Sequence, residues 1–192
     1  AVRIGWMQQH PTTENYDVKK SESLSDQPVR GVIDYKYVQP TWNLNFRTMI
    51  NDQVTLYQNN LPVTNAAHHF TSWLNKLRVS WNGLKNVYMK GAIDFSNDRV
   101  ESVEYEQERV DRYTLSAAID IRHDLFRRFK SALVLRNDLV GGTLGIPIGA
   151  IGLEYRSLNG HWSVGANLSR NYRFPTLNDL YYENLGKPDL KP

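Results

Sequence analysis

The chain has 192 residues, of which 41% are hydrophobic, and its 23 basic and 20 acidic side chains leave a formal charge of +3. The mean hydropathy is −0.54, and no run approaches the roughly 18 apolar residues that would predict a transmembrane helix. The lack of cysteine excludes a disulfide framework and thiolate metal sites. The near balance of charges gives no single-signed field that would favour nucleic acid as a partner.

Apolar and polar residues alternate along most of the chain with a period of two, which is typical of β-strands. In residues 162–172, for example, Trp162, Val164, Ala166 and Leu168 fall on one face, and small or polar residues fall on the other. The alternation predicts nine strands, near residues 1–9, 29–38, 41–57, 70–81, 85–97, 110–122, 128–138, 147–156 and 161–172. The predicted fold is all-β, with antiparallel strands in an up-and-down meander.

A soluble sandwich and a transmembrane barrel share this alternation, and three features favour the barrel. Most predicted strands reach the ~9 to 11 residues that cross a bilayer, whereas soluble strands cluster near about 5 to 6. Short connections alternate with longer ones, as in outer-membrane barrels. Aromatic residues flank the short turns, where strands would leave the hydrocarbon: Tyr37, Trp42, Trp81, Phe126, Phe129, Tyr155 and Trp162.

Charged residues occupy the polar phase of the predicted strands. A sandwich could hold them in water, but in a barrel they line a wet lumen, and their mixed signs favour a lining that meets protein. They are Arg30, Asp34, Lys36, Arg47, Lys76, Arg78, Lys90, Asp94, Arg112, Asp120, Arg122, Arg136 and Glu154. The apolar phase would then face lipid, so five of its residues should be exposed in the chain alone: Trp42, Leu115, Ile119, Trp162 and Leu168.

Nine strands do not close such a barrel. Bacterial single-chain barrels have an even number of strands, and lipid does not tolerate the unpaired backbone groups of an open edge. We therefore expect residues 1–192 to be an internal fragment of a larger barrel, with both outer edges of the sheet unpaired.

The closing stretch, NYRFPTLNDLYYENLGKPDLKP, predicts a short helix between two breaks. Thr176 can cap its N-terminus, Asp179 lies in its first turn, and Gly186 can end it before Pro188. Such a helix in a loop would fold an extracellular connection inward over the mouth of a barrel.

The same stretch resembles the signature of TonB-dependent outer-membrane transporters, a phrase like FRAPTLNDLY followed by GNPDLKPE. Phe174 stands where Ala is usual, and Lys187 stands where Asn is usual. The matching residues are Tyr172, Arg173, Phe174, Pro175, Thr176, Leu177, Asn178, Asp179, Leu180, Tyr181, Gly186, Pro188, Asp189, Leu190, Lys191 and Pro192.

The resemblance implies a receptor in the outer membrane of a Gram-negative bacterium. Its barrel would have about 22 strands and a plugged lumen, and residues 1–192 would supply about nine strands, without the plug domain or the TonB box. Implied partners are outer-membrane lipid, the plug, the TonB complex, and a small-molecule or metal-chelate ligand such as a ferric siderophore or cobalamin. A plug-less diffusion porin and a soluble β-rich binding module are the alternatives.

Tyrosines in or near the long loops are the candidate ligand-binding residues, because they could stack on a siderophore or cobalamin: Tyr16, Tyr57, Tyr105, Tyr181 and Tyr182. Tyrosine is equally expected in an interfacial girdle. His68 and His69 fall in a predicted long loop, where two histidines could bind haem or a metal ion. Adjacent histidines on an extended chain point apart, however, which counts against such a site. Haem receptors of the family that this stretch resembles typically place a histidine between the two halves of the signature. Residues 176–187 contain no histidine, which counts against haem as a ligand. We predict no metal site and no cofactor. No nucleophile, base and orienting group share a motif, so no enzyme activity is predicted.

Overall fold

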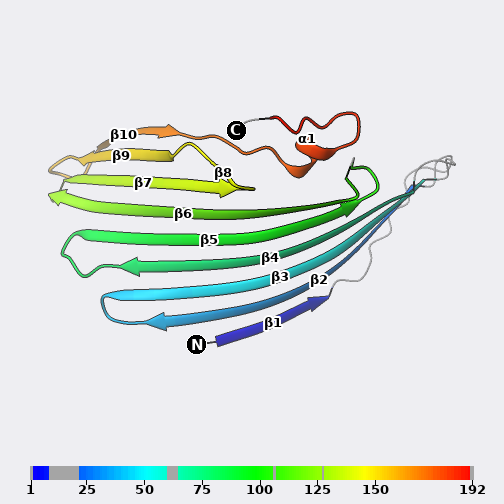
Figure 1. The fold of residues 1–192 in the computed structure, drawn as a ribbon. Helices are drawn as coiled ribbons and strands as arrows, with labels where there is room; N and C mark the ends of the chain where they lie inside the picture. Colours follow the sequence, from blue (N-terminus) through cyan, green and yellow to red (C-terminus); the bar gives the residue numbers. More distant parts are fainter. Residues whose placement is uncertain (1, 9–21, 60–64, 106, 127, 191–192) are drawn as a thin grey trace.

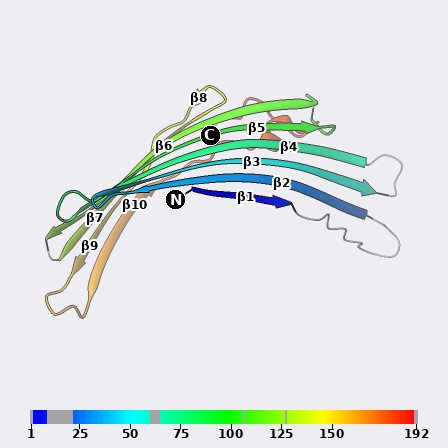
Figure 2. The same ribbon diagram turned by 90° about the horizontal axis from the view of Figure 1, so that it is seen from below.

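The computed structural model describes residues 2–8, 22–59, 65–105, 107–126 and 128–190, which form one curved antiparallel sheet (Figures 1 and 2). The strands are β1 (Val2–Gln8), β2 (Glu22–Val38), β3 (Trp42–Asn59), β4 (Asn65–Trp81), β5 (Val87–Ser102), β6 (Arg109–Phe126), β7 (Phe129–Val140), β8 (Thr143–Leu144), β9 (Ile148–Arg156) and β10 (Ser163–Arg170). Consecutive strands pair in the order β1 to β7, then β9 and β10, while the two-residue β8 pairs with β7.

The predicted nine-strand meander is thus confirmed. Within the described residues β1 pairs only with β2 and β10 only with β9, so the sheet is not closed. Short turns join the strands at one end of the sheet, on the left in Figure 1, which we call the short-turn end. The opposite end of β2 to β6 is called the long-loop end.

The strands extend further toward the long-loop end than the alternation predicts. Strand β2 begins at Glu22, whereas the alternation predicts its start near residue 29. Strand β5 continues to Ser102, whereas the alternation predicts its end near residue 97. Polar cross-strand contacts stabilise the extra length: Gln53 and Thr55 donate hydrogen bonds to Asp26 across 3.0 and 3.1 Å. Apolar alternation fails to mark this part because both of its faces carry polar side chains.

The connection after β7 also differs from the prediction. The residues around Gly141 and Gly142, read from sequence as a long connection, form a tight hairpin between β7 and β8. Gly141 and Gly142 have φ values of 55° and 87°, and residues with a side chain rarely adopt two such values in succession.

Successive residues of each strand point to opposite faces of the sheet. The cross-strand register places apolar residues beside apolar residues on one face and polar residues beside polar residues on the other. We call the face that carries Trp42, Trp81, Ile93 and Leu115 the apolar face, and the opposite one the polar face. One row of the apolar face runs Trp42, Trp81, Met89, Ile121 and Leu133 across β3 to β7. At the short turns the rings of Tyr37 and Trp42 lie 5.3 Å apart, and those of Phe129 and Tyr155 lie 4.8 Å apart.

Large side chains of the apolar face are exposed, as predicted for Trp42 (37%), Leu115 (42%), Trp162 (54%) and Leu168 (74%). Ile119 is the exception and is half-buried; its direct cross-strand partners are Gly91 in β5 and Leu135 in β7. The buried hydrophobic residues of the described chain form one small cluster at the long-loop end. In the part of the chain that the structure describes, no helix is long and apolar enough to cross a bilayer.

Candidate functional site

After β10 the chain continues toward the long-loop end, and we call residues 171–190 the closing segment (Figure 1). It crosses over the sheet and includes the helix α1 (Leu177–Tyr181), which lies near the ends of β5 and β6 (Figure 1). The closing segment therefore brings the predicted signature residues to the long-loop end of the sheet.

Leu177 anchors α1 to the polar face. Its side chain is buried with Val100 of β5, Val110 of β6 and Tyr105 of their connection, and Phe70 of β4 packs against this cluster. Val100 and Val110 are direct cross-strand partners, so Leu177 packs over a pair of strands rather than over a loop. This cluster gives an otherwise polar surface a local apolar attachment point.

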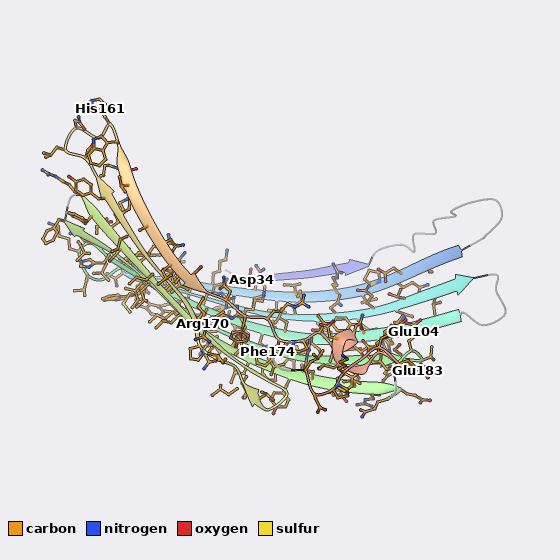
Figure 3. The ribbon with its side chains drawn as sticks, turned by 90° about the horizontal axis from the view of Figure 1, so that it is seen from above. Asp34, Glu104, His161, Arg170, Phe174 and Glu183 are labelled. Atoms are coloured by element: carbon orange, nitrogen blue, oxygen red, sulfur yellow. The ribbon has the colours of Figure 1, made fainter. Side chains whose placement is uncertain are left out.

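Polar contacts on the β5–β6 connection support the same attachment. The Tyr105 hydroxyl donates a hydrogen bond to the side-chain oxygen of Asn178, and the backbones of Tyr105 and Tyr182 form an antiparallel bridge. The Glu183 amide donates to the Glu104 carbonyl oxygen across 2.8 Å, which places these two residues side by side in Figure 3. The β5–β6 connection and the closing segment thus form one structural unit.

Thr176 caps the N-terminus of α1, as the sequence predicts, and Asp179 completes a capping box with it. The Asp179 amide donates to the Thr176 hydroxyl (3.2 Å), and the Thr176 amide donates to the Asp179 carboxylate (2.7 Å). The backbone bond from Thr176, followed by the contact with its side chain, lowers the pKa of Asp179 below its ordinary value.

The C-terminus of α1 differs from the prediction. The helix ends at Tyr181, with Tyr182 as its C-cap, and not at Gly186. Gly186 instead closes the following turn: its amide donates to the Tyr182 carbonyl oxygen across 2.7 Å. A Cβ at Gly186 would lie only 2.7 Å from the Leu180 carbonyl oxygen, which explains why this position requires glycine.

Three of the candidate ligand-binding tyrosines meet in this unit. Tyr105 is buried, and Tyr181 and Tyr182 pack against the same cluster. Burial raises the pKa of Tyr105, and the nearby Glu104 carboxylate raises that of Tyr182. Tyr57 belongs to β3, and Tyr16 lies outside the described residues, as do Lys191 and Pro192 of the signature. The structure therefore places Tyr105, Tyr181 and Tyr182 in packing positions and leaves their role in ligand binding a prediction.

His68 and His69 lie in β4, so their assignment to a long loop was wrong. Both pair with β3 and with β5, which keeps the backbone extended. His69 Nε2 lies 2.7 Å from a carboxylate oxygen of Asp52, whereas His68 Nε2 lies 3.3 Å from Glu104. Each histidine is thus engaged with a different carboxylate. Among the described residues, no group of three or more His, Asp or Glu side chains is arranged to hold a metal ion.

Ion pairs and hydrogen bonds link neighbouring strands across the polar face. Asp34 accepts from Arg47 and Asn45, at 2.7 Å each, and Arg78 forms a two-pronged pair with Asp94. Further along, Arg136 pairs with Asp138 of its own strand at 2.8 Å and donates across to Ser116 of β6 at 3.2 Å. At the short-turn end this face is hollowed over about 950 Å³, beside Tyr88, Arg122, Lys130, Glu154 and Asn167. The predicted lumen lining thus forms one continuous polar surface.

The apolar face ends abruptly toward the long-loop end. A row of Ile50, Trp73, Asn97 and Tyr113 is followed, two residues further along each strand, by a row of Asp52, Thr71, Arg99 and Asp111. Arg99 and Asp111 form an ion pair at 2.7 Å in this row. The apolar face thus has aromatic residues at both ends in β4, at the short-turn end in β3 (Trp42) and at the long-loop end in β6 (Tyr113), with charged residues beyond the long-loop row.

Neither of two comparisons with known proteins identifies a relative. No protein-family model matches the chain, and no curated protein matches it.

Proposed function

We propose that this chain forms part of the wall of a TonB-dependent outer-membrane transporter, which takes up a scarce nutrient such as a ferric siderophore or cobalamin. The observation that carries the proposal is that the two faces of the sheet have opposite character, one polar and one apolar. The segment with the transporter-like signature packs on the polar face, and the opposite face carries a bounded apolar band.

The band approaches the height of the apolar band of an outer-membrane barrel. Trp42 to Ile50, Trp73 to Trp81 and Tyr113 to Ile121 each span nine residues between the two bounding rows. At a rise of ~3.3 Å per residue this is about 26 Å along the strand, and at a tilt of ~40° it is about 20 Å across the membrane, close to the ~25 Å band of outer-membrane barrels. A soluble sheet has no need of an apolar band of constant height with tryptophan and tyrosine at its borders.

The polar face suits a lumen that holds protein. Cross-strand pairs such as Arg78 with Asp94 neutralise its charges locally, so another polar surface can lie against it without leaving unpaired charge. The hollow at the short-turn end would receive part of the plug, and the closing segment would fold over the outer mouth. Energy would come from the TonB complex acting on the plug, so the wall itself needs no catalytic group.

Uptake by cells that express the full-length protein tests this function. Accumulation of a panel of radiolabelled ferric siderophores and cobalamin should include at least one compound whose uptake stops when the TonB gene is deleted or a protonophore is added. Passive flux of small solutes into liposomes, insensitive to both treatments, would instead identify a diffusion porin. Extraction of the protein into buffer without detergent would contradict both membrane functions.

A further inference from the structure

Arg112 differs from every other arginine in strands β3 to β9. The other seven each have a side-chain nitrogen within 3.8 Å of an Asp or Glu oxygen: Arg47, Arg78, Arg99, Arg109, Arg122, Arg136 and Arg156. Arg112 has no such partner among the described residues, although it stands on the same polar face of β6 as Arg122. Its charge is therefore the one left uncompensated in this series.

Burial makes the lack of a carboxylate partner at Arg112 unfavourable in free energy. The residue is half-buried where the closing segment crosses β6, and its Nη1 donates to the Pro175 carbonyl oxygen across 3.0 Å. Its Nε is buried without a hydrogen-bond partner. The Nε–H and Nη2–H groups project from one edge of the guanidinium, the edge that grips a carboxylate or phosphate with two parallel bonds. That edge has no acceptor among the described residues.

The Tyr172 hydroxyl of the closing segment is also buried without a hydrogen bond. It lies so close to Gly145 that any side chain there would overlap it, and burial, followed by the nearby Asp138 carboxylate, raises the pKa of Tyr172. Arg112 Nε and this hydroxyl are the two unpaired buried side-chain atoms in the part of the chain described. Buried donors normally have partners, and of these two donors only Arg112 also carries a charge without an ion-pair partner among the described residues.

We propose that Arg112 is the centre of an oxyanion-binding site under the closing segment, which takes a carboxylate or phosphate group of the transported nutrient. This inference rests on the proposed function and assigns an anionic substrate class to it, such as a metal chelate with free carboxylates. Because Nε is shielded, the anion reaches it only when residues 172–175 move away from β6. Ligand binding is therefore coupled to displacement of the closing segment.

Calorimetric titration of the purified full-length protein in detergent tests the site. Citrate and inorganic phosphate are the probes, at constant ionic strength, with trimethyl citrate as an uncharged analogue of the same skeleton. Arg112→Gln removes the charge but can still donate to Pro175, and Arg112→Lys keeps the charge but loses the two-pronged edge. The matched control is Arg122→Gln, which removes an arginine paired with Asp120 from the same face of the same strand.

We expect saturable binding of citrate, phosphate or both, and none of trimethyl citrate. Arg112→Gln should weaken binding by at least about tenfold, the loss expected for a charge-assisted pair. Arg112→Lys should fall between Arg112→Gln and wild type, and Arg122→Gln should stay within about twofold of wild type. Absence of anion binding by wild type, or equal losses in Arg112→Gln and Arg122→Gln, would overturn the site. Heat-modifiable electrophoretic mobility checks that each variant is folded.

The anion-binding experiment and the uptake experiment can fail independently of each other. If TonB-dependent uptake is observed but neither anion binds, the oxyanion site is wrong and the proposed function stands. If anions bind at Arg112 but uptake does not depend on TonB, the site stands and the transporter class is wrong.

Discussion

The Tyr105 hydroxyl donates a hydrogen bond to the Asn178 side chain, which is 73 residues further along the chain. Tyr105→Phe removes this donor and keeps the ring in its cluster. We expect the free energy of opening the closing segment to fall by ~0.5 to 1.5 kcal/mol, the net contribution of one hydrogen bond. Amide hydrogen exchange of residues 176–183 measures it. Tyr113→Phe, an exposed ring on the other face of β6, is the control, and unchanged exchange in Tyr105→Phe would contradict the assigned role.

Leu177 should contribute more to the free energy that holds the closing segment on the sheet than any polar contact of that segment does. It is the residue of the segment whose side chain is buried against the sheet. Leu177→Ala removes three carbon atoms from the cluster, and we expect opening to become easier by about 2 kcal/mol or more. Limited proteolysis within residues 171–190 reports the opening. Leu185→Ala is the matched control, since Leu185 belongs to the same segment and is 77% exposed. Similar cleavage rates for the two variants would show that the cluster does not hold the segment.

The capping box makes the closing segment sensitive to acid. The pKa of Asp179 is lowered by its bonds with Thr176, so the carboxylate form favours the folded segment. This stabilisation is complete above the ordinary aspartate pKa and is lost as the pH falls below about 4 and through the lower folded value. The amide proton shift of Thr176, followed by NMR, should titrate with a midpoint below the ordinary aspartate value of about 4. A midpoint at or above that ordinary value would contradict the capping geometry, and Asp179→Asn should abolish the titration.

Period-two alternation predicted the meander because each strand separates two different environments. Where one face is apolar and the other polar, as from Tyr113 to Ile121, the sequence shows the strand directly. Beyond Asp52 and Asp111 the alternation changes phase, because Arg99 and Asp111 are charged residues of the apolar face while Val100 and Val110 are apolar residues of the polar face, so a fixed apolar phase no longer marks the strands. For the same reason His68 and His69 could not be recognised as strand residues.

The candidate site was less predictable, because it depends on contacts between distant segments. The N-cap at Thr176 is local and was predicted from the sequence, although the reciprocal contact of its amide with the Asp179 carboxylate was not. The packing of Leu177 on Val100 and Val110 requires the closing segment to return over β5 and β6, and no local pattern states this. The sequence shows part of the difference at Arg112, because Arg109, Arg122, Arg136 and Arg156 each have their carboxylate two residues away in the same strand, whereas Arg112 is flanked at that spacing by Val110 and Thr114. Only the cross-strand contacts show that no neighbouring strand of the described sheet supplies an ion-pair partner to Arg112 either, as β2 does for Arg47.

The central claim is that one face of this sheet meets lipid and the other meets a wet lumen, and neighbouring residues of β10 test it most directly. Leu168 is on the apolar face and is 74% exposed, whereas Asn167 lines the hollow of the polar face. Arginine on a lipid-facing position costs ~2 to 4 kcal/mol at the midplane and less near the interfaces.

The measurement is the free energy of unfolding of the full-length protein during reversible refolding into liposomes, repeated in a plug-deleted barrel to remove any clash of Asn167→Arg with the plug. Leu168→Arg should lower this free energy by at least ~1 kcal/mol more than Asn167→Arg does. Equal losses for the two variants, or a larger loss for Asn167→Arg, would contradict the assignment of the faces and with it the membrane barrel.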